Sequence, residues 1–288
     1  MTRREDYGLL DQEAVEGVGD EWEQVDVEDT EADTIARQQD REFLEFRKRI
    51  KDSEGLKVEA SVFDDATFAA IYKLVQDGHI EAFGGPVSTG KEAAVYTALG
   101  PEGTVAVKVY RISASDFRQM RDYLDGDPRF EGIGSDKKKV VLAWTRKEFA
   151  NLNRAREAGV RVPEPIAVER NVLVMEFVGS DEGQRGRRLA EVHVENPETA
   201  FEVVREYVRR LYDAGLIHGD LSEYNLVVHD GQLYVIDLGQ AVTVHHPSSR
   251  EFLERDCRNV AKFFARQGVD TSGEELLAYV TSEADPDR

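Results

Sequence analysis

Three side chains in the last third of the sequence have the types and the order needed for chemistry on a phosphate. Asp220 is followed five residues later by Asn225, and Asp237 then opens an Asp-Leu-Gly turn. A carboxylate can hold an attacking oxygen in line, while Asn and a second Asp bind the Mg²⁺ that neutralises the phosphates. This ordered set predicts phosphoryl transfer.

A glycine-containing segment, Gly84–Glu92, precedes this set and could approach a phosphate. Its glycines let backbone N–H groups come close to an anion, and Lys91 adds positive charge. The spacing from Gly85 to Lys91 fits a Walker A loop, but Glu92 stands where that loop requires Ser or Thr. The residues that follow have the pattern of a strand, so we expect a phosphate-covering turn between two strands. A plain hairpin is the alternative.

Lys108 ends the alternating run Val105-Ala106-Val107-Lys108, which predicts a strand. The pattern resembles the protein-kinase strand whose lysine grips the α- and β-phosphates of ATP. Such a lysine needs a carboxylate from a helix, and Glu148 lies on the only convincing helix before the next strand. A lysine on a solvated strand face and a solvated glutamate are the alternative interpretation.

Four segments make the resemblance specific. They are Ser88–Ala93, His218–Asn225, Ile236–Gln240 and, for one branch, Arg255–Val260. Together they resemble the RIO family of atypical serine/threonine protein kinases, and the first and last resemble its type-1 branch. The resemblance covers about residues 40–270.

The resemblance implies a two-lobed α+β fold of the protein-kinase type. A small β-rich N-lobe and a reduced helical C-lobe would follow N-terminal helices. The implied activity is ATP-dependent Ser/Thr kinase or ATPase chemistry with Mg²⁺ or Mn²⁺. The implied role is in late maturation of the small ribosomal subunit, with rRNA and ribosomal proteins as partners.

The resemblance also implies roles for individual residues. Asp220 would be the catalytic base, and Asn225 and Asp237 the metal ligands. Asp237 would in addition carry a transient phosphoaspartate, and Glu148 would orient Lys108. The nucleotide would be held by Ser88, Thr89, Gly90, Lys91 and Lys108, with the hinge backbone of Glu176 and Val178 facing adenine.

The sequence departs from ordinary protein kinases in its second half. Gly219 replaces the Arg that reads an activation-loop phosphate, and Ser222 stands where a lysine for the γ-phosphate is usual. Only 51 residues follow Asp237, too few for the helices that dock peptide substrates. These departures favour a nucleotide-driven switch on a large assembly.

Two other functions remain open at the level of sequence. Aminoglycoside and choline kinases also carry His-Gly-Asp before an Asn, so a small-molecule phosphotransferase is one alternative. A pseudokinase binding module is the other, although it would lack a catalytic group, and Lys108, Asp220, Asn225 and Asp237 are all present.

Composition limits the environment and the partners. The 288 residues carry a net charge of -20, of which residues 1–33 contribute -11 through 13 acidic residues against Arg3 and Arg4. Arg outnumbers Lys, 26 to 11. This balance is typical of a protein kept soluble in concentrated salt, so we expect a halophilic archaeal source. The acidity also argues against tight, nonspecific binding of nucleic acid, and we expect no DNA partner. The sequence has a polar start and lacks a long apolar run, so we expect a cytoplasmic protein without a membrane anchor.

Four regions should position the chemical groups. We predict an acidic disordered head over 1–35, a helical extension over 36–79, an N-lobe over 80–178 and a reduced C-lobe over 179–288. The extension should hold a helix over 65–76, and the N-lobe a mobile connection over 111–140 followed by a helix from Ala143. The C-lobe should hold helices over 198–213, 249–266 and 273–279.

Overall fold

The computed structural model describes residues 41–45, 63–112, 117–124, 127, 130 and 136–282. The chain divides into two units, residues 1–42 and 43–288, and the second holds all the elements discussed below. Residues 41–45 are helical. The acidic head predicted over 1–35 and most of the first half of the predicted helical extension lie outside the described residues.

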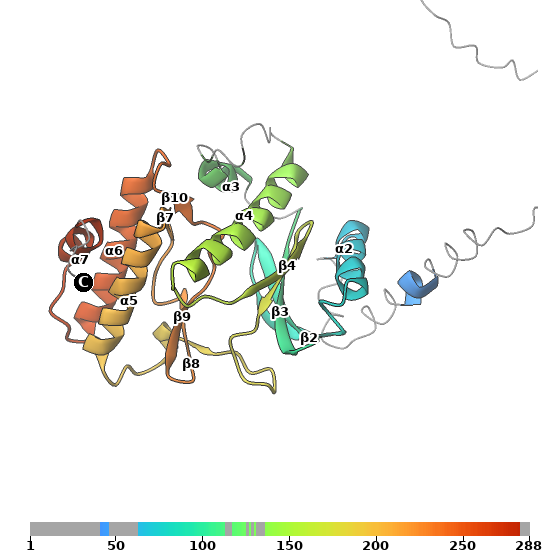
Figure 1. The fold of residues 1–288 in the computed structure, drawn as a ribbon, viewed down its shortest axis with the longest axis horizontal. Helices are drawn as coiled ribbons and strands as arrows, with labels where there is room; N and C mark the ends of the chain where they lie inside the picture. The colour runs from blue at the N-terminus through green and yellow to red at the C-terminus, as the bar shows by residue number, and fades with distance from the viewer. Residues whose placement is uncertain are drawn as a thin grey trace, which may run out of the picture. The chain divides into compact units, whose positions relative to one another are not determined.

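A five-stranded antiparallel sheet forms the N-lobe, with strand order β1-β2-β3-β5-β4 (Figure 1). Its strands are β1 (Ala82–Thr89), β2 (Ala93–Gly100), β3 (Gly103–Tyr110), β4 (Pro165–Glu169) and β5 (Val172–Glu176). Successive side chains of a strand point to opposite faces. In β3, Val107 and Val109 therefore pack on one face of the sheet, and Ala106 and Lys108 lie on the other.

A helix covers each face of this sheet (Figure 1). Helix α2 (Asp65–Gln76) buries Phe68, Ile71 and Leu74 against the face that holds Val107. It begins where predicted because the Asp64 side chain accepts a hydrogen bond from the Thr67 N–H. Helix α4 (Lys137–Glu157) lies on the opposite face and carries Glu148.

The C-lobe is mainly helical. Its helices are α5 (Pro197–Asp213), α6 (Ser249–Arg266) and α7 (Gly273–Thr281), with the short 3-10 helix η2 (Leu189–Glu191). Its strands are β6 (Arg187–Arg188), β7 (Leu216–Ile217), β8 (Leu226–His229), β9 (Gln232–Val235) and β10 (Val242–Thr243). Phe201 and Phe264 pack in the core between α5 and α6. The hairpin of β8 and β9 delivers Asp237 to the boundary with the N-lobe.

The glycine segment differs from the predicted loop. Strand β1 continues through Gly84 and Gly85, so the turn between β1 and β2 consists of Gly90, Lys91 and Glu92. β1 is an edge strand with irregular register around Pro86, which is where a sheet tolerates proline. A Cβ at Gly84 would collide with Thr97 on β2, so close strand pairing, rather than phosphate approach, explains that glycine.

The segment 111–140, expected to be a mobile connection, contains helical structure where it is described. Helix α3 (Phe117–Leu124) buries Met120, Tyr123 and Leu124 in the core. Helix α4 begins at Lys137 rather than Ala143, because the Asp136 side chain caps its first turn. No helix in the described part of the chain is long and apolar enough to cross a membrane.

Candidate active site

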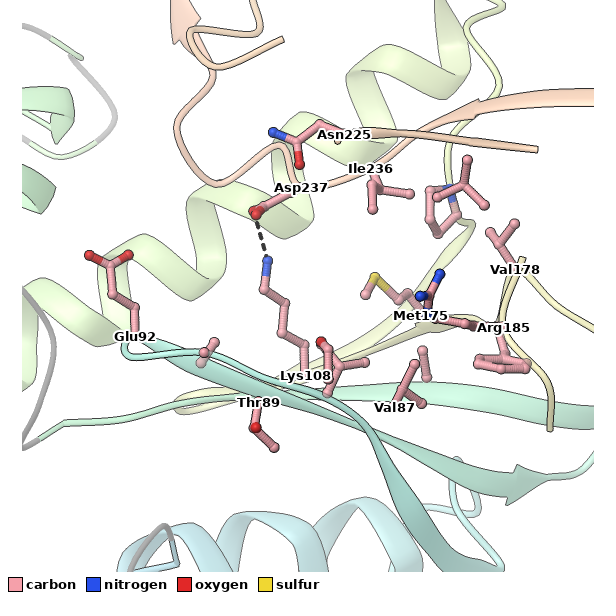
Figure 2. Close-up of a pocket in the computed structure, with 18 of the residues that line it drawn as sticks. Val87, Thr89, Glu92, Lys108, Met175, Val178, Arg185, Asn225, Ile236 and Asp237 are labelled. Atoms are coloured by element: carbon pink, nitrogen blue, oxygen red, sulfur yellow. Dashed lines mark hydrogen bonds and ion pairs between the residues drawn. The ribbon is translucent and has the colours of Figure 1, made fainter. Parts of the chain in front are cut away.

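A cavity of about 420 Å³ lies between the two lobes. The glycine turn, β3, the hinge after β5 and the β8–β9 hairpin all contribute to its wall (Figure 2). Nine residues selected from the sequence line this one cavity: Ser88, Thr89, Gly90, Lys91, Lys108, Glu176, Val178, Asn225 and Asp237. The fold thus brings together groups that are up to 149 residues apart in the sequence.

Lys108 contacts two carboxylates, that of Glu148 in the N-lobe and that of Asp237 in the C-lobe. Its Nζ lies 2.7 Å from Glu148 Oε1 and 2.9 Å from Asp237 Oδ1, and Figure 2 shows the side chain reaching from β3 toward Asp237. Glu148 does not line the cavity but lies behind Lys108, with 1% of its side chain exposed. The Tyr110 hydroxyl donates a hydrogen bond to the other oxygen of Glu148. Glu148 is therefore held from two sides and can orient Lys108.

The electrostatics keep this cluster charged. Burial acts to lower the pKa of Lys108, but the charges of Asp237 and Glu148 outweigh it and raise that pKa well above its usual range. The charge of Lys108 in turn lowers the pKa of Asp237. Burial and the charge of Glu148 raise the pKa of Tyr110, so its hydroxyl keeps its proton and remains a donor.

Asp220 is not among the residues that line the cavity, but it contacts Asn225, which is. The Asn225 Nδ2 group donates to the backbone carbonyl of Asp220 at 2.8 Å and approaches its carboxylate at 3.3 Å. Burial raises the pKa of Asp220, a change that suits a group accepting a proton near neutral pH. The His218 ring packs beneath, with Nδ1 accepting from the Asp220 N–H and Nε2 3.1 Å from the carbonyl of Ile236.

Asn225 and Asp237 fit a magnesium ion that also binds phosphates. Because the Asn225 amide nitrogen is bound to Asp220, its oxygen points toward Asp237 in Figure 2. These are two hard oxygen donors, and Mg²⁺ usually takes one or two protein oxygens and completes its octahedron with phosphates and water. No group of three or more His, Cys, Asp or Glu side chains that could hold a metal ion occurs among the described residues.

Sequence patterns missed the apolar part of the cavity. Its lining includes Val87, Val95, Ala106, Met175, Val227 and Ile236. Ala106 could have been found, because it precedes Lys108 by two residues and so shares its face of β3. Val87, Val95 and Met175 come from three strands of the N-lobe sheet, whereas Val227 comes from β8 and Ile236 follows β9, so only the tertiary structure makes them neighbours. They form a slot suited to a flat heterocycle such as adenine.

The comparisons with known proteins agree with this geometry. A family model described as the RIO domain matches residues 94–276. The RIO-type serine/threonine-protein kinase Rio1 of Haloferax volcanii is 68% identical over 284 residues, covering 98% of each chain. The Rio1 kinase of Methanocaldococcus jannaschii is 39% identical over 254 residues, covering 88% of this chain and 86% of the relative.

A solved structure supports the fold independently. The crystal structure of the Rio2 kinase-ADP/Mg²⁺-phosphoaspartate complex from Chaetomium thermophilum superposes with a TM-score of 0.58 at 23% identity. The match covers 75% of this chain and 67% of that one. The two-lobed kinase-like fold predicted from the sequence is thereby confirmed. The domain match and the two Rio1 relatives show that the chain belongs to the RIO family of serine/threonine-protein kinases, in its Rio1 branch.

Proposed function

We propose that this protein is an ATP-dependent Ser/Thr kinase and ATPase that acts on the small ribosomal subunit during late maturation, in the cytoplasm of a halophilic archaeon. One observation carries the enzymatic part: Lys108 bonds Glu148 and Asp237 at once, inside a cavity that Asn225 also lines. Lysine, two carboxylates and an amide in this arrangement are the parts that phosphoryl transfer requires.

Each group has a defined task in this proposal. The turn at Ser88–Lys91 covers the phosphates, Lys108 binds the α- and β-phosphates, and the backbone of Glu176 and Val178 faces adenine. Mg²⁺, or Mn²⁺, held by Asn225 and Asp237, would neutralise phosphate charge. Asp220 accepts the proton of the attacking hydroxyl or water.

Asp237 also serves as the phosphate acceptor in this proposal. A carboxylate oxygen of Asp237 attacks the γ-phosphorus, the bond to the β–γ bridging oxygen breaks, and its electron pair leaves with ADP. Water then attacks the acyl phosphate while Asp220 takes its proton, which releases inorganic phosphate and restores the carboxylate. The phosphoaspartate named for the Rio2 structure of Chaetomium thermophilum supports this route.

Radiolabelled ATP tests the enzymatic part. With [γ-³²P]ATP and Mg²⁺ we expect slow hydrolysis and an acid-stable label on the protein that hydroxylamine removes. Asp237→Asn should lose the label, and Asp220→Asn should lose most of the hydrolysis. Asp230→Asn is a matched control, because Asp230 shares the positive φ of Asp237, 47° against 63°, and its side chain is 88% exposed.

The outcomes separate the parts of the proposal. Label that resists hydroxylamine and lies on Ser or Thr would leave Asp237 as a metal ligand only. Absence of both hydrolysis and label in the wild-type protein would overturn the kinase and ATPase assignment. Cosedimentation with small ribosomal particles, with and without a non-hydrolysable ATP analogue, tests the ribosomal role. The ribosomal role would be excluded if the protein cosediments neither with nor without the analogue.

A further inference from the structure

Helix α4 places a second basic side chain next to Glu148. The Lys147 side chain is fully buried, at 0% exposure, although lysine is rarely buried without a partner. Its Nζ donates to the Gly239 backbone carbonyl at 2.8 Å and lies over the Trp144 ring, 4.9 Å from the centroid. Gly239 belongs to the Asp-Leu-Gly turn opened by Asp237, so Lys147 ties α4 to that turn.

Asn151 repeats this contact one helical turn later. Residues four apart share a face of a helix, so Asn151 lies beside Lys147. Its Nδ2 donates to the carbonyls of Leu238 at 3.1 Å and Ala241 at 3.0 Å. Two side chains of α4 therefore hold three backbone carbonyls between residues 238 and 241. This segment follows the end of β9 and lies outside the strand ladders.

The backbone at Asp237 needs such support. Its φ is 63°, in the left-handed region that non-glycine residues seldom adopt and hold only when the surroundings impose it. The turn also docks tightly, since a Cβ at Gly239 would lie 2.9 Å from Trp144 Nε1 and 3.0 Å from the Tyr110 hydroxyl oxygen. The direction of the Asp237 carboxylate therefore depends on how the next residues are held.

From these contacts we infer that Lys147 and Asn151 are positioning residues for Asp237. Helix α4 then sets both ends of the phosphate site, because Glu148 orients Lys108 while its neighbours aim the Asp237 carboxylate at the metal. The inference rests on the proposed function for its metal and nucleotide, and on the structure alone for the contact between α4 and the turn.

Two variants and two matched controls test this inference. Lys147→Met and Asn151→Leu replace each donor by an apolar group of similar size. Asn153→Leu removes an amide whose Nδ2 donates to the Phe149 carbonyl within the same helix. Lys139→Met removes an exposed lysine from the first turn of α4. Circular dichroism and thermal unfolding at one KCl concentration establish that each variant is folded. If Lys147→Met does not fold, Asn151→Leu decides alone.

The first measurement is hydrogen exchange of residues 236–241 without nucleotide or metal. The second is the affinity for ADP, measured with and without Mg²⁺. The ratio of the two affinities reports how well the site binds the metal. Losing a bond to a buried carbonyl should make hydrogen exchange in residues 236–241 about tenfold faster. It should also reduce the gain in ADP affinity that Mg²⁺ gives by about tenfold. ADP affinity without metal should stay at the wild-type value, and both controls should behave as wild type.

Each result decides something. If both variants exchange at the wild-type rate, the bonds from Lys147 and Asn151 do not hold the turn, and the inference is wrong. Faster exchange with an unchanged Mg²⁺ ratio overturns the positioning role and leaves a structural one. If the wild-type protein binds no ADP, the proposed function fails, and the exchange rates still decide whether Lys147 and Asn151 hold the turn.

Discussion

Lys108→Met isolates the energy of the buried ion pair with Glu148. The Lys108 side chain is 9% exposed and that of Glu148 is 1% exposed, so both charges are shielded from water. Removing one partner of a buried pair costs about 3–5 kcal/mol, because the remaining charge stays buried. The contact with Asp237 adds little, about 0–1 kcal/mol, since the Asp237 side chain is 51% exposed.

These magnitudes set the expected result. The free energy of unfolding should fall by about 3 kcal/mol, which lowers the thermal midpoint by about 6–12 °C for a folded unit of this size. The protein should keep its native circular dichroism at 25 °C and lose ATP hydrolysis. The double variant Lys108→Met/Glu148→Leu should recover most of the stability but none of the activity, because no buried charge is then left unpaired.

The assay is thermal unfolding followed by circular dichroism at constant KCl, beside hydrolysis of ATP. Lys73→Met is the matched control, since Lys73 forms an ion pair of the same length, 2.7 Å, with Glu169 but is 57% exposed. Its loss should leave the thermal midpoint close to the wild-type value, because solvent screens an exposed ion pair. If Lys108→Met costs no more than Lys73→Met, the argument from burial is wrong. If it still hydrolyses ATP, the assignment of Lys108 is wrong.

Three further predictions concern the net charge and two buried side chains, Asp256 and Cys257. The thermal midpoint should rise from low to molar KCl, because salt screens the net charge of -20; a flat or falling midpoint contradicts this. Burial raises the pKa of Asp256 to about 6 from its usual 3.8, so the folded state gains stability below about pH 4 and loses it as the pH rises through about 6. Asp256→Asn should flatten the plot of unfolding free energy against pH between about pH 4 and 6. An unchanged plot would show that the Asp256 carboxyl does not cause this pH dependence. Burial also raises the pKa of the Cys257 thiol to about 12, so a thiol reagent should react with the folded protein no faster than it unfolds.

Local signals in the sequence were sufficient for most elements. Helix α2 occupies the predicted residues 65–76, where the Asp64 cap precedes an apolar stripe. Helix α6 occupies the predicted residues 249–266, where an apolar stripe is present but no side chain caps the first turn. The order of Lys108, Asp220, Asn225 and Asp237 could also be read directly. The pairing of Lys108 with Glu148 needed only one long helix between two strands.

Elements that depend on distant contacts were not predictable in this way. Gly84 and Gly85 indicated a loop, but pairing of β1 with β2 keeps them in a strand. Helix α3 is polar overall, and it is stabilised by burying Met120 and Tyr123 against parts of the chain more than 20 residues away. Phe117, Met120 and Leu124 are spaced as on one face of a helix, but a pattern of eight residues in a polar segment is too short to predict a helix by itself.

The amino-acid sequence by itself determined which chemical groups are present, their order and the local elements that carry them. Only the tertiary structure decided which lysine is buried against which carbonyl. Lys147 and Lys139 are both lysines of α4, yet one is fully buried on Gly239 and the other is exposed. The difference arises because the 238–241 turn, about 90 residues later in the chain, packs across one face of the helix and not across its first turn.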